Sequence, residues 1–85
     1  MDVIPSRSVM KRYFFDVVSP CRSEFDYRGR EFASPEKAYA LAELIALDLG
    51  ISPQGEWTGF TVNVHDSQGR KFYSQPVAAL ELAAA

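Results

Sequence analysis

The stretch RYFFDVVS, residues 12–19, decides the fold, because its apolar side chains recur with the two-residue period of a β-strand. The side of this strand that we expect to face the interior holds Tyr13, Phe15 and Val17. Phe14 and Val18 fall on the other side, beside charged neighbours. That second face is therefore expected to be partly covered or to make a further contact.

Three further segments have strand character. The turn residues SPCR, 19–22, end the first strand, and the segment SEFDYRGREF that follows predicts a short second strand interrupted near Gly29, a residue suited to a positive φ. The segment TGFTVNVHD alternates again, DSQGR at 66–70 is typical of a hairpin turn, and RKFYS returns as a fourth strand.

Residues 35–49 predict a helix. Ser34 suits the N-cap, Pro35 the first helical position, and Gly50 a left-handed residue just after the helix end. At about 100° per residue, one stripe should cover the sheet, consisting of Ala38, Leu41, Ala42, Ile45 and Leu49.

The opposite side of the predicted helix is apolar as well. It carries Ala40, Leu44 and Leu47 where a helix that faces water is normally charged. Either another part of the chain covers these three side chains or a second subunit does.

Together these segments predict an α+β domain in the order β-β-α-β-β, with a four-stranded antiparallel sheet and one main helix packed across it. Residues 11–76 form this single domain, which suits a chain of 85 residues. Residues 1–10 are expected to form a mobile arm, and residues 77–85 a short helix or tail that follows the strand-ending Pro76. Val77, Leu80 and Leu82 are candidates for covering exposed apolar surface.

The overall charge argues against several partners. The net charge is −2 and the sequence pI about 5.2, so nucleic acid and anionic membranes are not expected partners. A single cysteine, Cys21, excludes an intrachain disulfide and a cysteine-based zinc site. Without an export signal or a run of apolar residues long enough to span a bilayer, we expect a cytoplasmic protein.

Few residues have the chemistry of a catalytic or ligand site. His65 is the only histidine and is interpreted as a surface residue, because it and Asp66 should point to opposite faces of a strand. Trp57 is interpreted as closing one end of the core. We predict no catalytic residue, no metal ligand and no cofactor, and no small-molecule ligand is evident, so an enzyme is not expected.

The order of these signals resembles a family of small bacterial domains of unknown function, found mainly in soil and root-nodule bacteria. The matching pieces are RYFFD at 12–16, the helix from Ala38 to Leu49, Trp57, and VHDSQGR at 64–70. The resemblance spans residues 11–75 and implies a β-β-α-β-β fold in a bacterial, cytoplasmic protein. It implies no activity, cofactor or functional residue.

Two functional interpretations remain open. The first is a non-enzymatic interaction or regulatory module that associates with itself, or with another protein, through Ala40, Leu44 and Leu47. The alternative is a small nucleic-acid-binding regulator that uses a basic and aromatic sheet surface. Such a surface would consist of Arg12, Phe14, Lys71 and Tyr73, provided that the first and fourth strands present them on one side.

Overall fold

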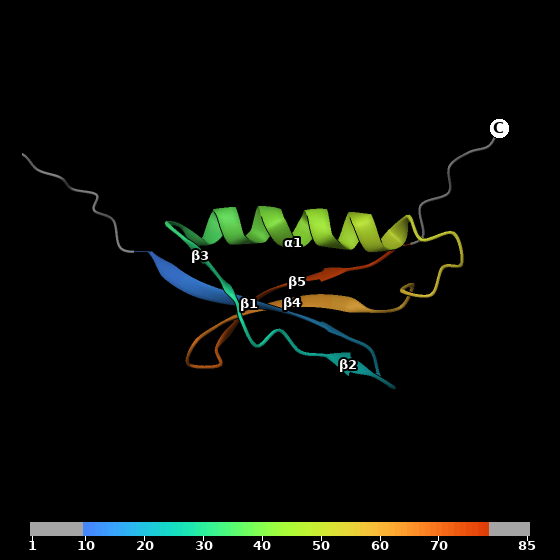
Figure 1. Cartoon of the computed structure of the whole chain (residues 1–85), viewed down its shortest axis with the longest axis horizontal. Helices are drawn as coiled ribbons and strands as arrows, with labels where there is room; N and C mark the ends of the chain where they lie inside the picture. The colour runs from blue at the N-terminus through green and yellow to red at the C-terminus, as the bar shows by residue number, and fades with distance from the viewer. Residues whose placement is uncertain (1–9, 79–85) are drawn as a thin grey trace, which may run out of the picture.

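The computed structural model describes residues 10–78, and the two terminal segments, 1–9 and 79–85, lie outside the described part. Its elements are β1 (Lys11–Val18), β2 (Ser23–Glu24), β3 (Arg30–Phe32), α1 (Pro35–Gly50), β4 (Thr61–Asp66) and β5 (Lys71–Pro76). All strand pairs are antiparallel and α1 lies across one face of the sheet (Figure 1). The predicted α+β class is confirmed.

The sheet has five strands rather than four, because the predicted second strand is divided. Its order is β2-β1-β4-β5, and β3 pairs with the other end of the same edge of β1. β2 pairs with Val17 and Val18, whereas β3 pairs with Lys11 to Tyr13. Gly29, between them, has the predicted positive φ of 71°, and a Cβ there would collide with the β1 backbone and two β1 side chains.

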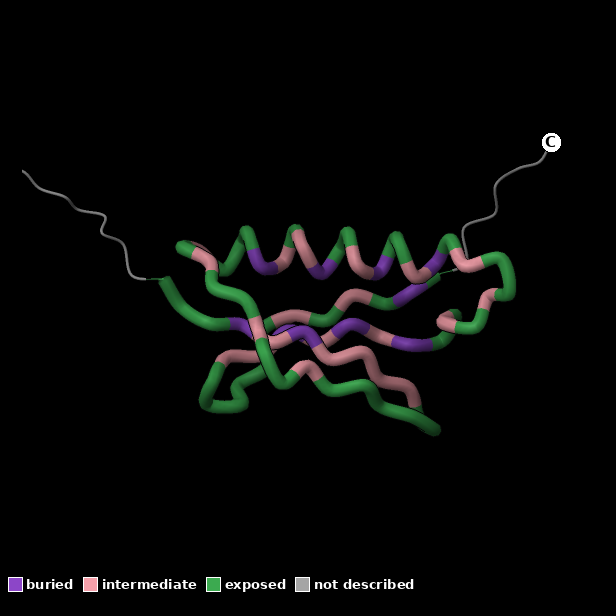
Figure 2. The backbone as a smooth tube through the Cα atoms, in the orientation of Figure 1, coloured by how far each residue is buried: buried purple, intermediate pink, exposed green. Residues whose placement is uncertain are grey.

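The faces of β1 follow the predicted alternation. Tyr13 and Phe15 are buried against α1, with 3% and 8% of their surface exposed. In β4, Val62 and Val64 lie opposite Val17 and Phe15 and are fully buried. The core therefore lies between α1 and the two central strands (Figure 2).

Small side chains form the centre of the helix face that meets the sheet. Ala38, Ala42 and Ala46 are buried at intervals of four residues. The predicted stripe does face the sheet. Its large side chains are only partly buried, however, and lie along the margins of the contact: Leu41, Ile45 and Leu49. Methyl groups at the centre allow the helix to lie close to the sheet.

Both ends of α1 differ from the expectation. Ser34 occupies the N-cap position in an extended conformation, but its side chain makes no capping hydrogen bond. Gly50 is the last helical residue rather than a left-handed residue after the helix, and Ile51 follows in a right-handed conformation. Glycine is needed at position 50 because a Cβ there would collide with the carbonyl oxygen of Ala78.

The segment after β5 belongs to the core at its start. Val77 is 4% exposed, and its N–H donates to the carbonyl of Phe60 at 2.9 Å. Val77 thus supplies apolar cover, whereas Leu80 and Leu82 lie outside the described residues. Within residues 10–78, α1 is the one helix, and it is not long and apolar enough to cross a bilayer.

The alanine contact can be tested by enlarging one residue on each side of α1. Ala42→Leu should lower the free energy of unfolding by about 1–3 kcal/mol, because the added atoms would push the helix away from the sheet. Ala40→Leu makes the same change on the exposed side of the helix, and it should alter the free energy of unfolding by less than about 0.5 kcal/mol. Urea denaturation at low protein concentration compares the two, and equal effects would contradict the packing described here.

Candidate functional site

The outward side of α1 carries an apolar line. Leu44 is 61% exposed and Leu47 is 50% exposed, and the exposed Ala40 lies one turn before Leu44. The structure adds Ile51, which is 52% exposed and which the sequence pattern did not single out. In Figure 2 the exposed residues of α1 recur along the side away from the sheet. We call these four residues the outer line.

The outer line has the spacing of a helix-pairing seam. Its members follow one another at intervals of four, three and four residues, which is the spacing of the a and d positions in a coiled coil. Ile51 was missed because the helix was expected to end before Gly50. The helix ends at Gly50, and Ile51, its C-cap residue, keeps a right-handed helical conformation that extends the line by one position.

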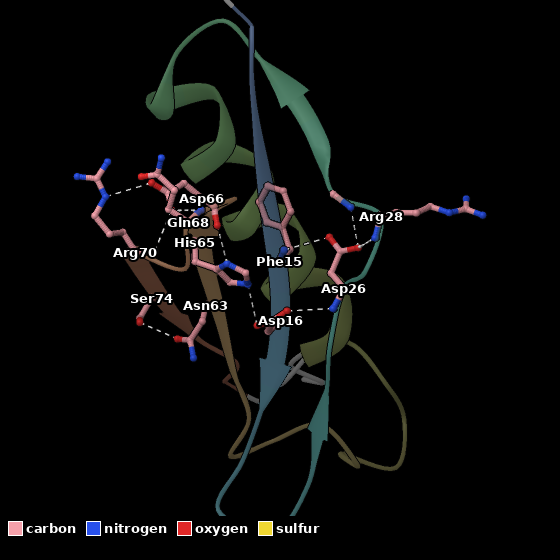
Figure 3. A network of polar contacts seen from close by, with 11 residues as sticks. Phe15, Asp16, Asp26, Arg28, Asn63, His65, Asp66, Gln68, Arg70 and Ser74 are labelled. Carbon is pink, nitrogen blue, oxygen red and sulfur yellow. Dashed lines mark hydrogen bonds and ion pairs between the residues drawn. The ribbon is translucent and has the colours of Figure 1, made fainter.

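The sheet face away from α1 carries a polar network (Figure 3). The Nε2 atom of His65 lies 3.0 Å from Oδ2 of Asp16 on the neighbouring strand, and its Nδ1 lies 3.0 Å from the carbonyl oxygen of Asp66. The imidazole also stacks on Phe14, with 5.3 Å between the ring centroids. His65 therefore lies on the open face of the sheet, with its side chain 26% exposed and paired rather than fully solvated.

Asp26 holds the unpaired part of the β1 edge in place. Between β2 and β3, the N–H of Phe15 donates to Oδ2 of Asp26 at 3.1 Å, where a neighbouring strand would supply a carbonyl. The N–H groups of Arg28 and Gly29 donate to its Oδ1, both at 3.0 Å. Its own N–H donates to Asp16 at 2.9 Å, which joins this segment to the pair of Asp16 and His65.

The pKa of Asp26 is lower than the usual value of a carboxyl group. Partial burial works to raise this pKa, but hydrogen bonds from the N–H groups of Gly29, Phe15 and Arg28 and the charge of His65 outweigh it. The ionised carboxylate is therefore the form that the fold stabilises.

Asp66 plays the equivalent part in the β4–β5 hairpin. Its Oδ1 accepts the N–H groups of Gln68 and Arg70 at 2.9 and 2.8 Å, and its Oδ2 accepts Nε of Arg70 at 3.2 Å. The hydrogen bond from the Arg70 N–H lowers the pKa of Asp66 the most, and the other two bonds act in the same direction. Together they outweigh burial, which works to raise this pKa.

The hairpin and the segment around Asp26 flank a cavity of about 480 Å³, whose walls include Phe14, Phe25 and Tyr27. Both ring nitrogens of His65, which lines this cavity, already face oxygen atoms of the chain. In the described part of the chain, no three His, Cys, Asp or Glu side chains are grouped to hold a metal ion. The hydrogen bonds of the network join the Asp26 segment and the β4–β5 hairpin to the sheet.

The residues of the predicted nucleic-acid surface do not share one face. Phe14 stacks on His65, and Lys71 is opposite His65 in the register, so both lie on the open face. Tyr73 stacks on Tyr39 of α1 at 4.5 Å and therefore lies on the helix side. Arg12 donates to the carbonyl of Arg28 and to the carboxylate of Glu31, which neutralises its charge. The condition for this interpretation, that the four residues lie on one side, is not met.

This arrangement defines a small α+β domain with an apolar outer line on α1, the one helix of residues 10–78. A family of domains, described as a domain of unknown function (DUF6894), matches residues 12–78. The chain belongs to the DUF6894 family. No curated protein and no solved structure matches the chain.

The role of Asp26 is testable through its acid dependence. Asp26→Asn should lower the free energy of unfolding by about 2 kcal/mol at pH 7, because an amide nitrogen cannot accept the N–H bonds that one carboxylate oxygen receives. The folded-state pKa is lowered, so this stabilisation is complete well above the unfolded value of about 3.9 and is lost as the pH falls through the folded value.

Urea denaturation from pH 7 to pH 2 provides the measurement. The difference between the wild type and Asp26→Asn should shrink below about pH 4, whereas Glu56→Gln, which removes an exposed carboxylate, should show little difference at any pH. A difference for Asp26→Asn that does not change with pH would count against the proposed hydrogen bonds to the ionised form.

Proposed function

We propose that this domain is a non-enzymatic interaction module that associates with a second copy of itself through the outer line of α1. The observation that supports this proposal is the exposure of Leu44, Leu47 and Ile51, each half or more exposed, on one side of a single helix. Scattered exposed leucines are common, but a continuous line from Ala40 to the end of the helix is a surface suited to association.

A second copy is favoured because the line is self-complementary in spacing. Two such helices can interdigitate their a- and d-type side chains at a shallow crossing angle. α1 has 16 residues and is therefore about 24 Å long, enough for three to four turns of contact. A two-fold axis perpendicular to both helices would place the same line on each side of the interface.

The charges beside the line favour an antiparallel pair. Lys37 near the start of α1 and Asp48 near its end lie on the same flank of the line. In an antiparallel pair, the flanks that carry Lys37 and Asp48 lie on the same side of the interface, so side chains of opposite charge face each other there. The two helix dipoles also attract each other, because the positive end of each lies beside the negative end of the other. Glu43, on the other flank, is held toward the sheet by the Tyr73 hydroxyl at 2.8 Å.

A seam of one helix per subunit is smaller than a standard protein interface. The association is therefore expected to depend on protein concentration in the micromolar range or above. An apolar helix of another protein would fit the same line, and such a partner would compete with the second copy.

Sedimentation velocity over a concentration series tests the proposal. The wild type should shift toward a dimer as concentration rises, and Leu44→Lys and Leu47→Lys should remain monomeric, because each places a charge in the seam. The thermal stability of the two variants should change little, since both side chains are exposed.

The matched control is Gln54→Lys, which adds the same charge at an exposed position after the helix. It should associate like the wild type. A wild type that stays monomeric at millimolar concentration, or lysine variants that associate as the wild type does, would refute self-association through this line.

A further inference from the structure

A second cavity is lined by residues from the start of α1, the start of β1 and the β4–β5 hairpin. These three parts of the chain lie toward the same end of the molecule (Figure 1). Its volume is about 490 Å³, within the range of small-molecule sites. It is separate from the outer line, and it shares Arg70 with the polar network of Figure 3. Two cationic side chains line it, Lys11 and Arg70, and no carboxylate does.

The most informative group in this cavity is the hydroxyl of Tyr13. Tyr13 lines the cavity although only 3% of its surface is exposed, and its hydroxyl has no hydrogen-bond partner among residues 10–78. The hydroxyl of a largely buried tyrosine normally has a hydrogen-bond partner, so this one can donate to a ligand that enters the cavity. Burial raises the pKa of this hydroxyl, with smaller effects in the same direction from Tyr39, Glu36 and Asp66, so it remains a donor at neutral pH.

The two cations have unused capacity. Lys11 makes no ion pair within the described part of the chain. Arg70 donates to Asp66 through its Nε atom and lies over the ring of Phe72, 5.6 Å from its centroid. Its terminal nitrogens make no hydrogen bond to any described residue and remain available as donors.

The start of α1 adds to the positive potential. The first N–H groups of a helix lack partners within the helix, and the side chain of Ser34 does not cap them. Pro35 lines the cavity directly at this helix end. Glu36 reduces the potential there but does not line the cavity.

We propose that this cavity binds an organic anion, with its carboxylate or phosphate group held by the Tyr13 hydroxyl between Lys11 and Arg70. Phe72, 42% exposed, and Tyr39 provide aromatic walls against which a flat apolar body packs. The carboxylate and phosphate share this chemistry, because both accept hydrogen bonds from a hydroxyl and from a guanidinium group.

Titration of the full chain by amide NMR, with benzoate, phenyl phosphate and inorganic phosphate as probes, tests this site. Benzoate or phenyl phosphate should give saturable shifts at residues that line the cavity, and the stronger of the two identifies the anionic group. The affinity should fall as salt is added. The absence of saturable shifts with both organic probes would overturn the proposal, and equal affinity for inorganic phosphate would overturn the role of the aromatic walls.

Variants separate a binding role of Tyr13 from a purely structural one. Tyr13→Phe keeps the ring and removes only the hydroxyl, and it should weaken binding of the better probe about five- to tenfold while the protein stays folded. Lys11→Gln should have an effect of similar size, and because Lys11 is exposed this variant tests the site even if Tyr13→Phe unfolds. Arg28→Gln, which removes a charge from an exposed residue outside the cavity, should bind like the wild type. Unchanged affinity in Lys11→Gln and in a folded Tyr13→Phe would refute the site.

Discussion

The close contact between the alanine stripe of α1 and the two central strands is the constraint on which the rest of the structure depends. Ala38, Ala42 and Ala46 bring the helix backbone near the fully buried Val62 and Val64. Because the centre of the contact is filled by methyl groups, the larger side chains of the helix lie at its margins or point away. The outer line is thus a consequence of how the helix meets the sheet.

The opposite face of the sheet is organised by carboxylates rather than by apolar packing. Asp26 replaces a strand partner for Phe15, Asp66 shapes the hairpin, and Asp16 joins the first of these segments to His65. Each carboxylate accepts hydrogen bonds from groups that would otherwise lack a partner, which stabilises short loops that have few apolar contacts.

The sequence predicted those features that depend on neighbours along the chain. The alternation in β1, the helix after Ser34 and the positive φ of Gly29 follow from local period and backbone sterics, and the structure confirms them. The exposure of Leu44 follows from helical geometry in the same way.

Features that depend on contacts between distant segments could not be predicted. The pairing of His65 with Asp16 requires the β1–β4 register, and the need for glycine at position 50 arises from Ala78, 28 residues later. The division of the second strand depends on Asp26 reaching the β1 edge, which no local pattern indicates. The cavity beside Tyr13 likewise forms only when β1, α1 and β5 come together.

The most direct test of the central claim is an isotope-filtered NOE experiment on an equimolar mixture of ¹³C-labelled and unlabelled protein at high concentration. If the alanine contact directs the outer line toward a second copy, intermolecular NOEs should connect the methyl groups of Leu44 and Leu47 across the interface, and the buried methyl groups of Val62 and Val64 should show none. Intermolecular NOEs confined to the β5 edge or to the open sheet face, or none at all, would contradict this account.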